Sequence, residues 1–215
     1  MFYLDPRNVY RVRALDRLGW LDHGFGTRLS GNWVPGPLAW VKQIHSDRIV
    51  VANGATGLLG EADGLIASTP GRYVGVRTAD CIPILIADER VKAVGAVHAG
   101  WRGTAETIAA KAVVAMRKNF GSRPEDLIAA IGPGICGACY EVGPEVAERF
   151  VAWLPPGKTL DLAEANRRQL IEAGVPGGRV ITGAPCTACH PSEFYSWRRD
   201  RERTGRMVSA AAVLG

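Results

Sequence analysis

Short apolar runs crowd the first half of the chain and restrict its architecture to one built on sheets. The runs Leu38–Ile44, Arg48–Val51, Tyr73–Arg77, Ile82–Ala87 and Ala93–Val97 are rich in valine and isoleucine and are bounded by Gly, Asp or Asn. Runs of this length and composition predict five short strands. We expect these strands to form a sheet at the centre of the fold.

The pattern changes to a helical period at Thr104. Ile108, Ala112 and Met116 fall on one stripe, Thr104 is a suitable N-cap, and Gly121 is a suitable C-terminal stop. The same signals predict further helices and strands downstream. The expected helices cover Pro144–Trp153 and Leu162–Ala173, and the expected strands cover Leu127–Ile131, Arg179–Thr182 and Met207–Leu214.

The whole chain reads as one unit. Its 215 residues are 47% hydrophobic and 22% charged, enough apolar material for an ordinary globular core. The segment Leu154–Lys158 predicts a turn and not a domain boundary, while Pro83 predicts an edge strand or a bulge. We expect a single α/β domain over residues 1–215, with helices outside a mixed sheet.

Three residues at the ends of strand-like runs suggest a metal site. His45, Cys81 and His98 supply two imidazoles and one thiolate, a ligand set of catalytic zinc sites that leaves one coordination position open. Two other interpretations stay open. The three residues are ordinary core residues, or Cys81 and His98 form a nucleophile and base pair without a metal.

The segment Gly95–Glu106 concentrates further chemistry around His98. An apolar strand leads into a glycine-containing turn and then a helix start, where free N–H groups and Arg102 predict an anion site. The alternative is a corner that serves packing alone. Asp80, directly before Cys81, is either a general acid or base, or a residue that orients a ligating imidazole or caps a turn.

Arginines crowd one stretch near the C-terminus. Arg198, Arg199, Arg201, Arg203 and Arg206 lie within nine residues, although the net charge is only +5. Such a tract can bind phosphate, or it can be a surface strand whose arginines pair with neighbouring acids. Little aromatic interleaving and no evident recognition helix make nucleic acid an unexpected partner.

Four other cysteines form two C-x-x-C pairs. Cys136 with Cys139 and Cys186 with Cys189 have the spacing of a structural four-cysteine zinc site. A second metal site, a reversible disulfide, and plain packing or loop cysteines all remain open. Cys186 to His190 also matches a haem attachment pattern, which requires an exported protein.

Sequence features favour a cytoplasmic protein with reduced cysteines. No apolar run approaches the roughly 20 residues needed to cross a bilayer. The first eight residues are quickly polar and lack the pattern of a secretory signal. We therefore expect no membrane partner; the oligomeric state stays open.

Motifs over nearly the whole chain resemble the YfiH or laccase-domain family, also called multicopper polyphenol oxidoreductase or peptidoglycan editing factor. The matching phrases, in the family's order, are His23–Phe25 with Thr27 and Arg28, Gln43–Ser46, Ala62–Gly64, Thr78–Pro83, Val97–Thr104, Ile131–Gly134, Cys139–Val142 and Arg198–Asp200 with Thr204–Arg206.

The resemblance implies a fold and an activity. The fold would be a central β-sandwich of mixed sheets flanked by helices, similar to cysteine-dependent toxin deamidases. The activity would be a zinc-dependent purine nucleoside phosphorylase acting on adenosine, inosine, guanosine and methylthioadenosine with phosphate, with adenosine deaminase activity besides. His45, Cys81 and His98 would hold the zinc. Asp80, Cys81, His98 and Arg102 would be catalytic, and Gln43, Arg48, Arg77, Arg102, Gly103 and Thr104 would contact substrate or phosphate.

Other functions are open under the same resemblance. A copper-dependent, laccase-like polyphenol oxidase is less favoured, because a copper cluster needs many imidazoles and the chain has four histidines. Copper can still enter a Cys/His site in vitro. An amide hydrolase editing peptidoglycan precursors and a non-enzymatic nucleotide-binding module are the remaining alternatives. The segment 28–43 is shorter than usual in the family, which leaves the pocket wall and substrate preference open.

Overall fold

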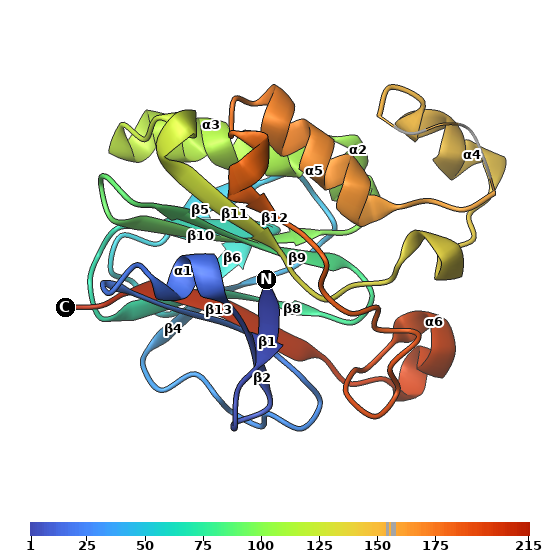
Figure 1. The fold of residues 1–215 in the computed structure, drawn as a ribbon, viewed down its shortest axis with the longest axis horizontal. Helices are drawn as coiled ribbons and strands as arrows, with labels where there is room; N and C mark the ends of the chain where they lie inside the picture. Colours follow the sequence, from blue (N-terminus) through green and yellow to red (C-terminus); the bar gives the residue numbers. More distant parts are fainter. Residues whose placement is uncertain (154, 156–157) are drawn as a thin grey trace.

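The computed structural model describes all residues except 154, 156 and 157 and contains two sheets packed face to face (Figure 1). Within the described residues, one sheet has seven strands in the order β1-β2-β3-β13-β8-β4-β6. Their bounds are β1 Phe2–Leu4, β2 Val9–Val12, β3 Leu21–Gly26, β13 Met207–Val213, β8 Arg72–Thr78, β4 Leu38–Lys42 and β6 Gly57–Glu61. The second has six strands in the order β12-β11-β9-β10-β7-β5. Their bounds are β12 Val180–Ile181, β11 Leu127–Ile131, β9 Ile82–Asp88, β10 Ala93–Ala99, β7 Gly64–Ala67 and β5 Ile49–Val51.

Helices cover the outer face of the six-stranded sheet. The longest are α3 (Ile108–Phe120) and α5 (Leu162–Glu172), which lie side by side above that sheet in Figure 1. The shorter ones are α1 (Arg13–Asp16), α2 (Trp101–Ala105), α4 (Pro144–Ala147) and α6 (Trp197–Asp200). The 3₁₀ turns are η1 (Pro124–Asp126), η2 (Gly137–Cys139), η3 (Glu148–Phe150), η4 (Gly177–Arg179) and η5 (Arg201–Arg203). The expected sandwich of mixed sheets with flanking helices is confirmed.

Apolar side chains form one core layer on each side of the six-stranded sheet. Between the sheets, Leu65, Leu85 and Val74 are completely buried. Between this sheet and the helices, Ile84 packs in a cluster with Met116. Every residue of β9 and β10 is buried, because both faces are covered and both edges are paired. Their unbroken apolar runs therefore follow from burial on both faces.

The edge position predicted from Pro83 is wrong. β9 pairs with β10 on one side and with β11 on the other. Pro83 is the second residue of β9, and its carbonyl accepts a hydrogen bond from the Gly132 N–H at 2.8 Å. Pro83 lies at the end of the ladder with β11, one residue beyond the last strand pair, Ile131 opposite Ile84. The bond that its missing N–H cannot donate is therefore at the margin of the sheet, where a proline is tolerated.

The single helix predicted from Thr104 is also wrong, because two helices are present. α2 begins at Trp101 after Gly100, and Thr107 adopts a left-handed conformation (φ 59°) that separates α2 from α3. Gly121 ends α3 in the left-handed conformation, as predicted. The predicted helix Leu162–Ala173 and the predicted strands are present, most with ends shifted by one or two residues, whereas Pro144–Trp153 contains the short α4 followed by η3. The strands β1, β2, β3, β6 and β7 were missed. The turn predicted over Leu154–Lys158 lies mostly outside the described residues.

The short segment 28–43 packs mainly against the outer face of the seven-stranded sheet. Trp33 is buried there, and its indole N–H donates to the Val208 carbonyl at 3.0 Å. A Cβ on Gly24 would lie 2.9 Å from the Trp33 ring, so these two residues are matched in size. Only the end of the segment, from Trp40 onward, reaches the main pocket. No helix of the described residues is long and apolar enough to span a membrane.

We expect acid to destabilise this fold through His23. Its Nε2 accepts a hydrogen bond from the Val12 N–H at 2.9 Å. Burial and the nearby Arg11 lower the pKa of His23 to about 4. Since an unfolded imidazole titrates near about 6.5, the unfolded chain binds a proton that the folded chain rejects, and stability rises with pH in this window.

The free energy of unfolding should therefore fall by about 2 kcal/mol between pH 7 and pH 5 from this group alone. Urea denaturation at both pH values measures the change. A His23→Gln variant should show a smaller loss, and His190→Gln, at an exposed histidine, should match the wild type. Equal losses in wild type and His23→Gln would contradict the assignment to His23.

Candidate metal centre and its pocket

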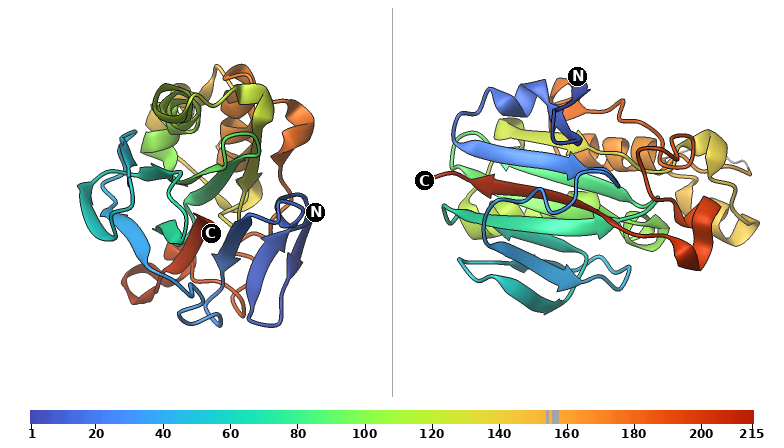
Figure 2. Two further views of the ribbon diagram at one scale, coloured as in Figure 1. Left: turned by 90° about the vertical axis from the view of Figure 1, so that its left-hand side faces the viewer. Right: turned by 90° about the horizontal axis from the view of Figure 1, so that it is seen from below.

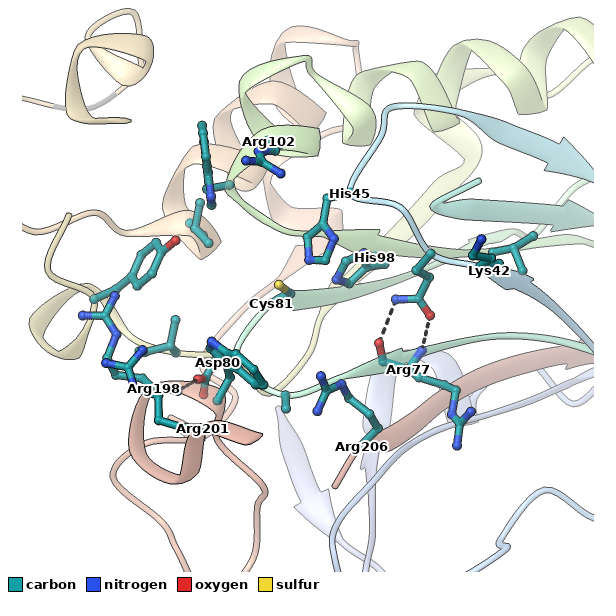
Figure 3. A pocket seen from close by; sticks show the side chains of 18 of the residues that line it. Lys42, His45, Arg77, Asp80, Cys81, His98, Arg102, Arg198, Arg201 and Arg206 are labelled. Carbon is teal, nitrogen blue, oxygen red and sulfur yellow. Dashed lines mark hydrogen bonds between the residues drawn. The ribbon is translucent and has the colours of Figure 1, made fainter. Parts of the chain in front are cut away.

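Three chain segments bring His45, Cys81 and His98 together (Figure 3). His45 follows β4, Cys81 lies in the turn from β8 to β9, and His98 is near the end of β10. One ligand atom from each residue lies within 4.8 Å of the other two. His98 is buried, Cys81 is half-buried and His45 is exposed. The cluster therefore opens to one side, as a site with a free coordination position requires.

The buried carboxylate of Asp63 organises this cluster. Its Oδ1 accepts hydrogen bonds from the His98 ring at Nδ1 (2.8 Å) and from the His45 N–H (3.0 Å). Its Oδ2 accepts from the Ile44 N–H (3.2 Å), the Ser46 N–H (2.6 Å) and the Ser46 hydroxyl (2.7 Å). The bond at Nδ1 leaves Nε2 of His98 for a metal. The same carboxylate shapes the loop that presents His45.

Asp63 was missed as a site residue in the sequence analysis. It appeared there only as part of the motif Ala62–Gly64, at the start of β7. A carboxylate in an apolar strand neighbourhood was the available signal, since such groups are seldom buried without a partner. Burial alone raises the pKa of Asp63, but hydrogen bonds from His98 and Ser46 outweigh burial and lower it.

Mutual electrostatics favour a thiolate at Cys81. Burial opposes ionisation of this thiol, but the imidazoles of His98 and His45 outweigh burial and lower the pKa of Cys81 to about 6. Burial also disfavours the His98 imidazolium, yet the Cys81 thiolate and the Asp63 carboxylate raise the pKa of His98 to about 9. The thiolate is the form of cysteine that binds metals and acts as a nucleophile.

Gly100 keeps space open beside the three residues. A Cβ at this position would lie 3.0 Å from the Cys81 sulfur and 3.1 Å from Cδ2 of His45. Gly100 has φ −76°, a conformation open to any residue, so the backbone itself does not require glycine. Glycine is needed at this position because the absence of a Cβ leaves space beside Cys81 and His45. Donor chemistry and this free volume together fit a zinc ion.

A pocket of about 750 Å³ opens over the cluster and is strongly basic. Arg77, Arg102, Arg198, Arg201 and Arg206 line it (Figure 3). Within the described part of the chain, none of the five forms an ion pair with a carboxylate. Uncompensated guanidinium groups around a cavity attract and hold anions.

Aromatic side chains form the other walls of this pocket. Trp101, Tyr140 and Trp197 line it, and each stacks with an arginine of the pocket at 5.1 to 5.8 Å. The arginine tract is therefore not a surface strand, and that alternative is wrong. Its residues form α6 and η5, and only Arg199 pairs with Asp200 as that alternative required.

Asp80 lies next to the cluster, but its carboxylate is already occupied. Oδ1 accepts from the Thr187 hydroxyl at 2.6 Å, and Oδ2 accepts from the Ser196 hydroxyl at 3.1 Å and the Arg198 N–H at 2.6 Å. These bonds attach the loop before α6, and α6 itself, to the turn that carries Cys81. The structure favours a positioning role over the acid–base role expected of Asp80.

The remaining predicted residues divide into two groups. Gln43 lines the pocket, but its amide bonds both the N–H and the carbonyl of Arg77 at 2.8 Å (Figure 3). Arg48, Gly103 and Thr104 lie outside the pocket lining. Thr104 is fully buried and its hydroxyl accepts a hydrogen bond from Asn166, so its predicted contact with phosphate needs correction.

The chain matches the family model described as multi-copper polyphenol oxidoreductase laccase over residues 28–214. It belongs to this family. A purine nucleoside phosphorylase of Deinococcus radiodurans is 45% identical, with 98% of this chain and 78% of the relative aligned. An adenosine deaminase, RL5, from an unknown prokaryotic organism is 36% identical over 79% of this chain and 72% of the relative.

Two solved structures have a similar fold. The crystal structure of YlmD from Geobacillus stearothermophilus has a TM-score of 0.89 and 28% identity, covering 100% of this chain and 99% of YlmD. The Bacillus licheniformis hypothetical protein YfiH has a TM-score of 0.88 and 28% identity, covering 99% and 98% of the two chains. The fold of this chain is thus similar to that of both solved structures over nearly their whole length.

Replacing Asp63 should weaken metal binding by about 10- to 100-fold, because the His98 ring loses its fixed orientation. Zinc affinity of Asp63→Asn, measured by competition with a chromophoric chelator, tests this role. Asp47→Asn, in the same loop but at the surface, is the matched control and should bind zinc as the wild type does. An unchanged zinc affinity in a folded Asp63→Asn variant would refute the role of Asp63.

Filling the space at Gly100 should also weaken zinc binding while leaving the fold intact. The methyl group of Gly100→Ala would press on Cys81 and His45, and we expect a loss of about tenfold or more, or about 1.4 kcal/mol. Gly178→Ala, where the added carbon meets nothing within 4 Å, serves as control. Isothermal titration with zinc on both variants gives the comparison. Wild-type affinity in Gly100→Ala would show that the space is not needed.

Proposed function

We propose that the chain is a zinc-dependent purine nucleoside phosphorylase that also deaminates adenosine. The observation that carries the proposal is the combination in one cavity of a Cys/His₂ cluster, unpaired arginines and aromatic walls. Adenosine, inosine, guanosine and methylthioadenosine are the proposed nucleosides, and inorganic phosphate is the second substrate. The names of relatives, which include purine nucleoside phosphorylases and an adenosine deaminase, support this choice.

The pocket suits a nucleoside in size and chemistry. Its volume of about 750 Å³ falls in the usual range of small-molecule sites, about 300 to 1,000 Å³. A purine can stack on Trp101, Tyr140 or Trp197, as bases do on aromatic side chains. Burial and the nearby Cys81 raise the pKa of Tyr140 to about 12, so its hydroxyl stays protonated and can donate a hydrogen bond.

The arginines suit the phosphate. Phosphorolysis forms a bond from a phosphate oxygen to C1′ of the ribose and breaks the bond from C1′ to the purine nitrogen, which gains the proton that the hydrogen phosphate loses. Arg102, Arg77 and Arg198 would hold the phosphate dianion by charge-assisted hydrogen bonds. The Asp63 bond would keep His98 oriented during the reaction. Zinc held by His45, Cys81 and His98 would supply a Lewis acid for substrate polarisation or water activation.

A copper oxidase is less well supported by the available donors. Of the four histidines, His23 is buried with its Nε2 bonded to the Val12 N–H. His190 contacts the Cys186 carbonyl through Nδ1. Two imidazoles, His45 and His98, therefore remain for metal binding in the pocket, fewer than a multicopper cluster needs.

Product analysis tests the proposed reaction. Protein purified without metal-affinity resin should release adenine from adenosine only with phosphate and form inosine without phosphate. Both activities should disappear in His45→Ala and His98→Ala and after zinc removal by a chelator. Phenol turnover with bound copper, or activity that survives these changes, would overturn the proposal.

The phosphate role of Arg102 has a separate test. Losing a charge-assisted hydrogen bond costs about 1.5 to 3 kcal/mol, so Arg102→Ala should raise the KM for phosphate by about tenfold or more. Arg203→Ala, which removes an arginine outside the pocket lining, is the matched control. Steady-state kinetics with phosphate varied at saturating adenosine give both values. An unchanged KM for phosphate would exclude Arg102 as a phosphate ligand.

A further inference from the structure

Four cysteines that are not part of the pocket cluster meet at one point. Cys136 and Cys139 lie after β11, and Cys186 and Cys189 lie in the loop after β12. Their four sulfur atoms all lie within 4.8 Å of one another, and those of Cys139 and Cys189 are 3.3 Å apart. Each C-x-x-C pair is thus completed by a pair about 50 residues away along the chain.

The backbone around the four sulfurs holds them in place. The Cys139 N–H donates to the Cys136 carbonyl at 3.0 Å, which closes the first C-x-x-C turn as η2. Gly134 and Cys186 form a β-bridge, and the Thr187 N–H donates to the Gly134 carbonyl at 3.0 Å. The two turns are therefore fastened to each other by main-chain bonds that do not involve sulfur.

A backbone donor and an arginine lie beside the cluster. The Cys136 N–H points at the Cys186 sulfur, with a nitrogen–sulfur distance of 3.2 Å. The Arg199 guanidinium donates to the carbonyls of Thr187 and Ala188 at 3.0 and 3.2 Å and pairs with Asp200, so it braces the second turn while its charge is compensated. The hydrogen bond from the Cys136 N–H reduces the cost of a thiolate at Cys186.

We propose that Cys136, Cys139, Cys186 and Cys189 bind a second zinc ion, separate from the pocket cluster. A tetrahedral site with zinc–sulfur bonds of about 2.3 Å places its sulfurs about 3.8 Å apart, and the present spacing reaches this with small side-chain shifts. Binding converts the thiols to thiolates and releases their protons to solvent. All four cysteines are free thiols in this structure, which is the state that zinc binding requires.

Four protein ligands fill the coordination of zinc, so this ion would have a structural role. The first turn leads directly into Tyr140, and the second contains Thr187, which bonds Asp80. Asp80 in turn holds the N–H of Arg198, whose side chain stacks on Tyr140. The second zinc would hold the two C-x-x-C turns together and so stabilise one wall of the nucleoside pocket.

Metal content and cobalt spectra test this site without any activity measurement. Protein purified under reducing conditions, without metal-affinity resin, should bind two zinc ions per chain. The double variant Cys139→Ser/Cys189→Ser should bind one, and so should His45→Ala/His98→Ala. After cobalt replacement, the histidine variant should keep the absorption bands of a four-thiolate centre. Ala138→Ser, inside the first C-x-x-C turn, is the matched control and should bind two.

Several results would overturn the second site. They are a zinc content that Cys139→Ser/Cys189→Ser leaves unchanged from the wild type after reconstitution with excess zinc, iron in place of zinc, or fewer than five titratable thiols in denaturant with a chelator, which reveals a disulfide. If the cysteine variant does not fold, the cobalt spectrum of the wild-type protein decides: lack of four-thiolate bands refutes the proposal. None of these results depends on the proposed enzymatic function, which would fail separately through product analysis.

Discussion

The carboxylate of Asp63 is the constraint on which the candidate centre depends. It lies on the six-stranded sheet, is completely buried, and accepts hydrogen bonds from Ile44, His45, Ser46 and His98. One charged group thereby sets the tautomer of one imidazole and the path of the loop that carries the other. A buried carboxylate is costly unless it is fully hydrogen-bonded, and this one is. The same bonds that stabilise it therefore impose the geometry of the site.

The site occupies the place where the two sheets separate at one end of the sandwich. His45 and Cys81 follow β4 and β8 of the seven-stranded sheet, whereas His98 belongs to β10 of the six-stranded sheet. The helices α4 and α6 gather at this end of the molecule (Figures 1 and 2). Hydrogen bonds of Asp80 tie α6 to the turn between the sheets. The packed apolar strands therefore form the rigid base of the pocket, and the loops contribute its basic side chains.

Much of this arrangement could be predicted from short-range patterns, and the errors have physical reasons. The runs around β8, β9 and β10 predicted strands correctly because their residues are buried on both faces. Pro83 misled the prediction because it lies near the start of a central strand, where the ladder with β11 ends. Thr104 suggested a cap, yet it is buried inside α2, since Gly100 begins the helix and Thr107 ends the turn. Local patterns do not contain these long-range partners.

The sequence by itself determined the donor types, the buried central strands and the family, because these follow from residue types and their spacing along the chain. Only the tertiary structure decided which donors meet. It placed Asp63 against His98, put Arg198, Arg201 and Arg206 in the pocket lining while leaving Arg203 outside it, and brought the sulfur of Cys139 next to that of Cys189. The physical reason is that hydrogen bonds and metal ligation act over a few ångströms. Residues far apart in sequence come within that range only when the two sheets pack.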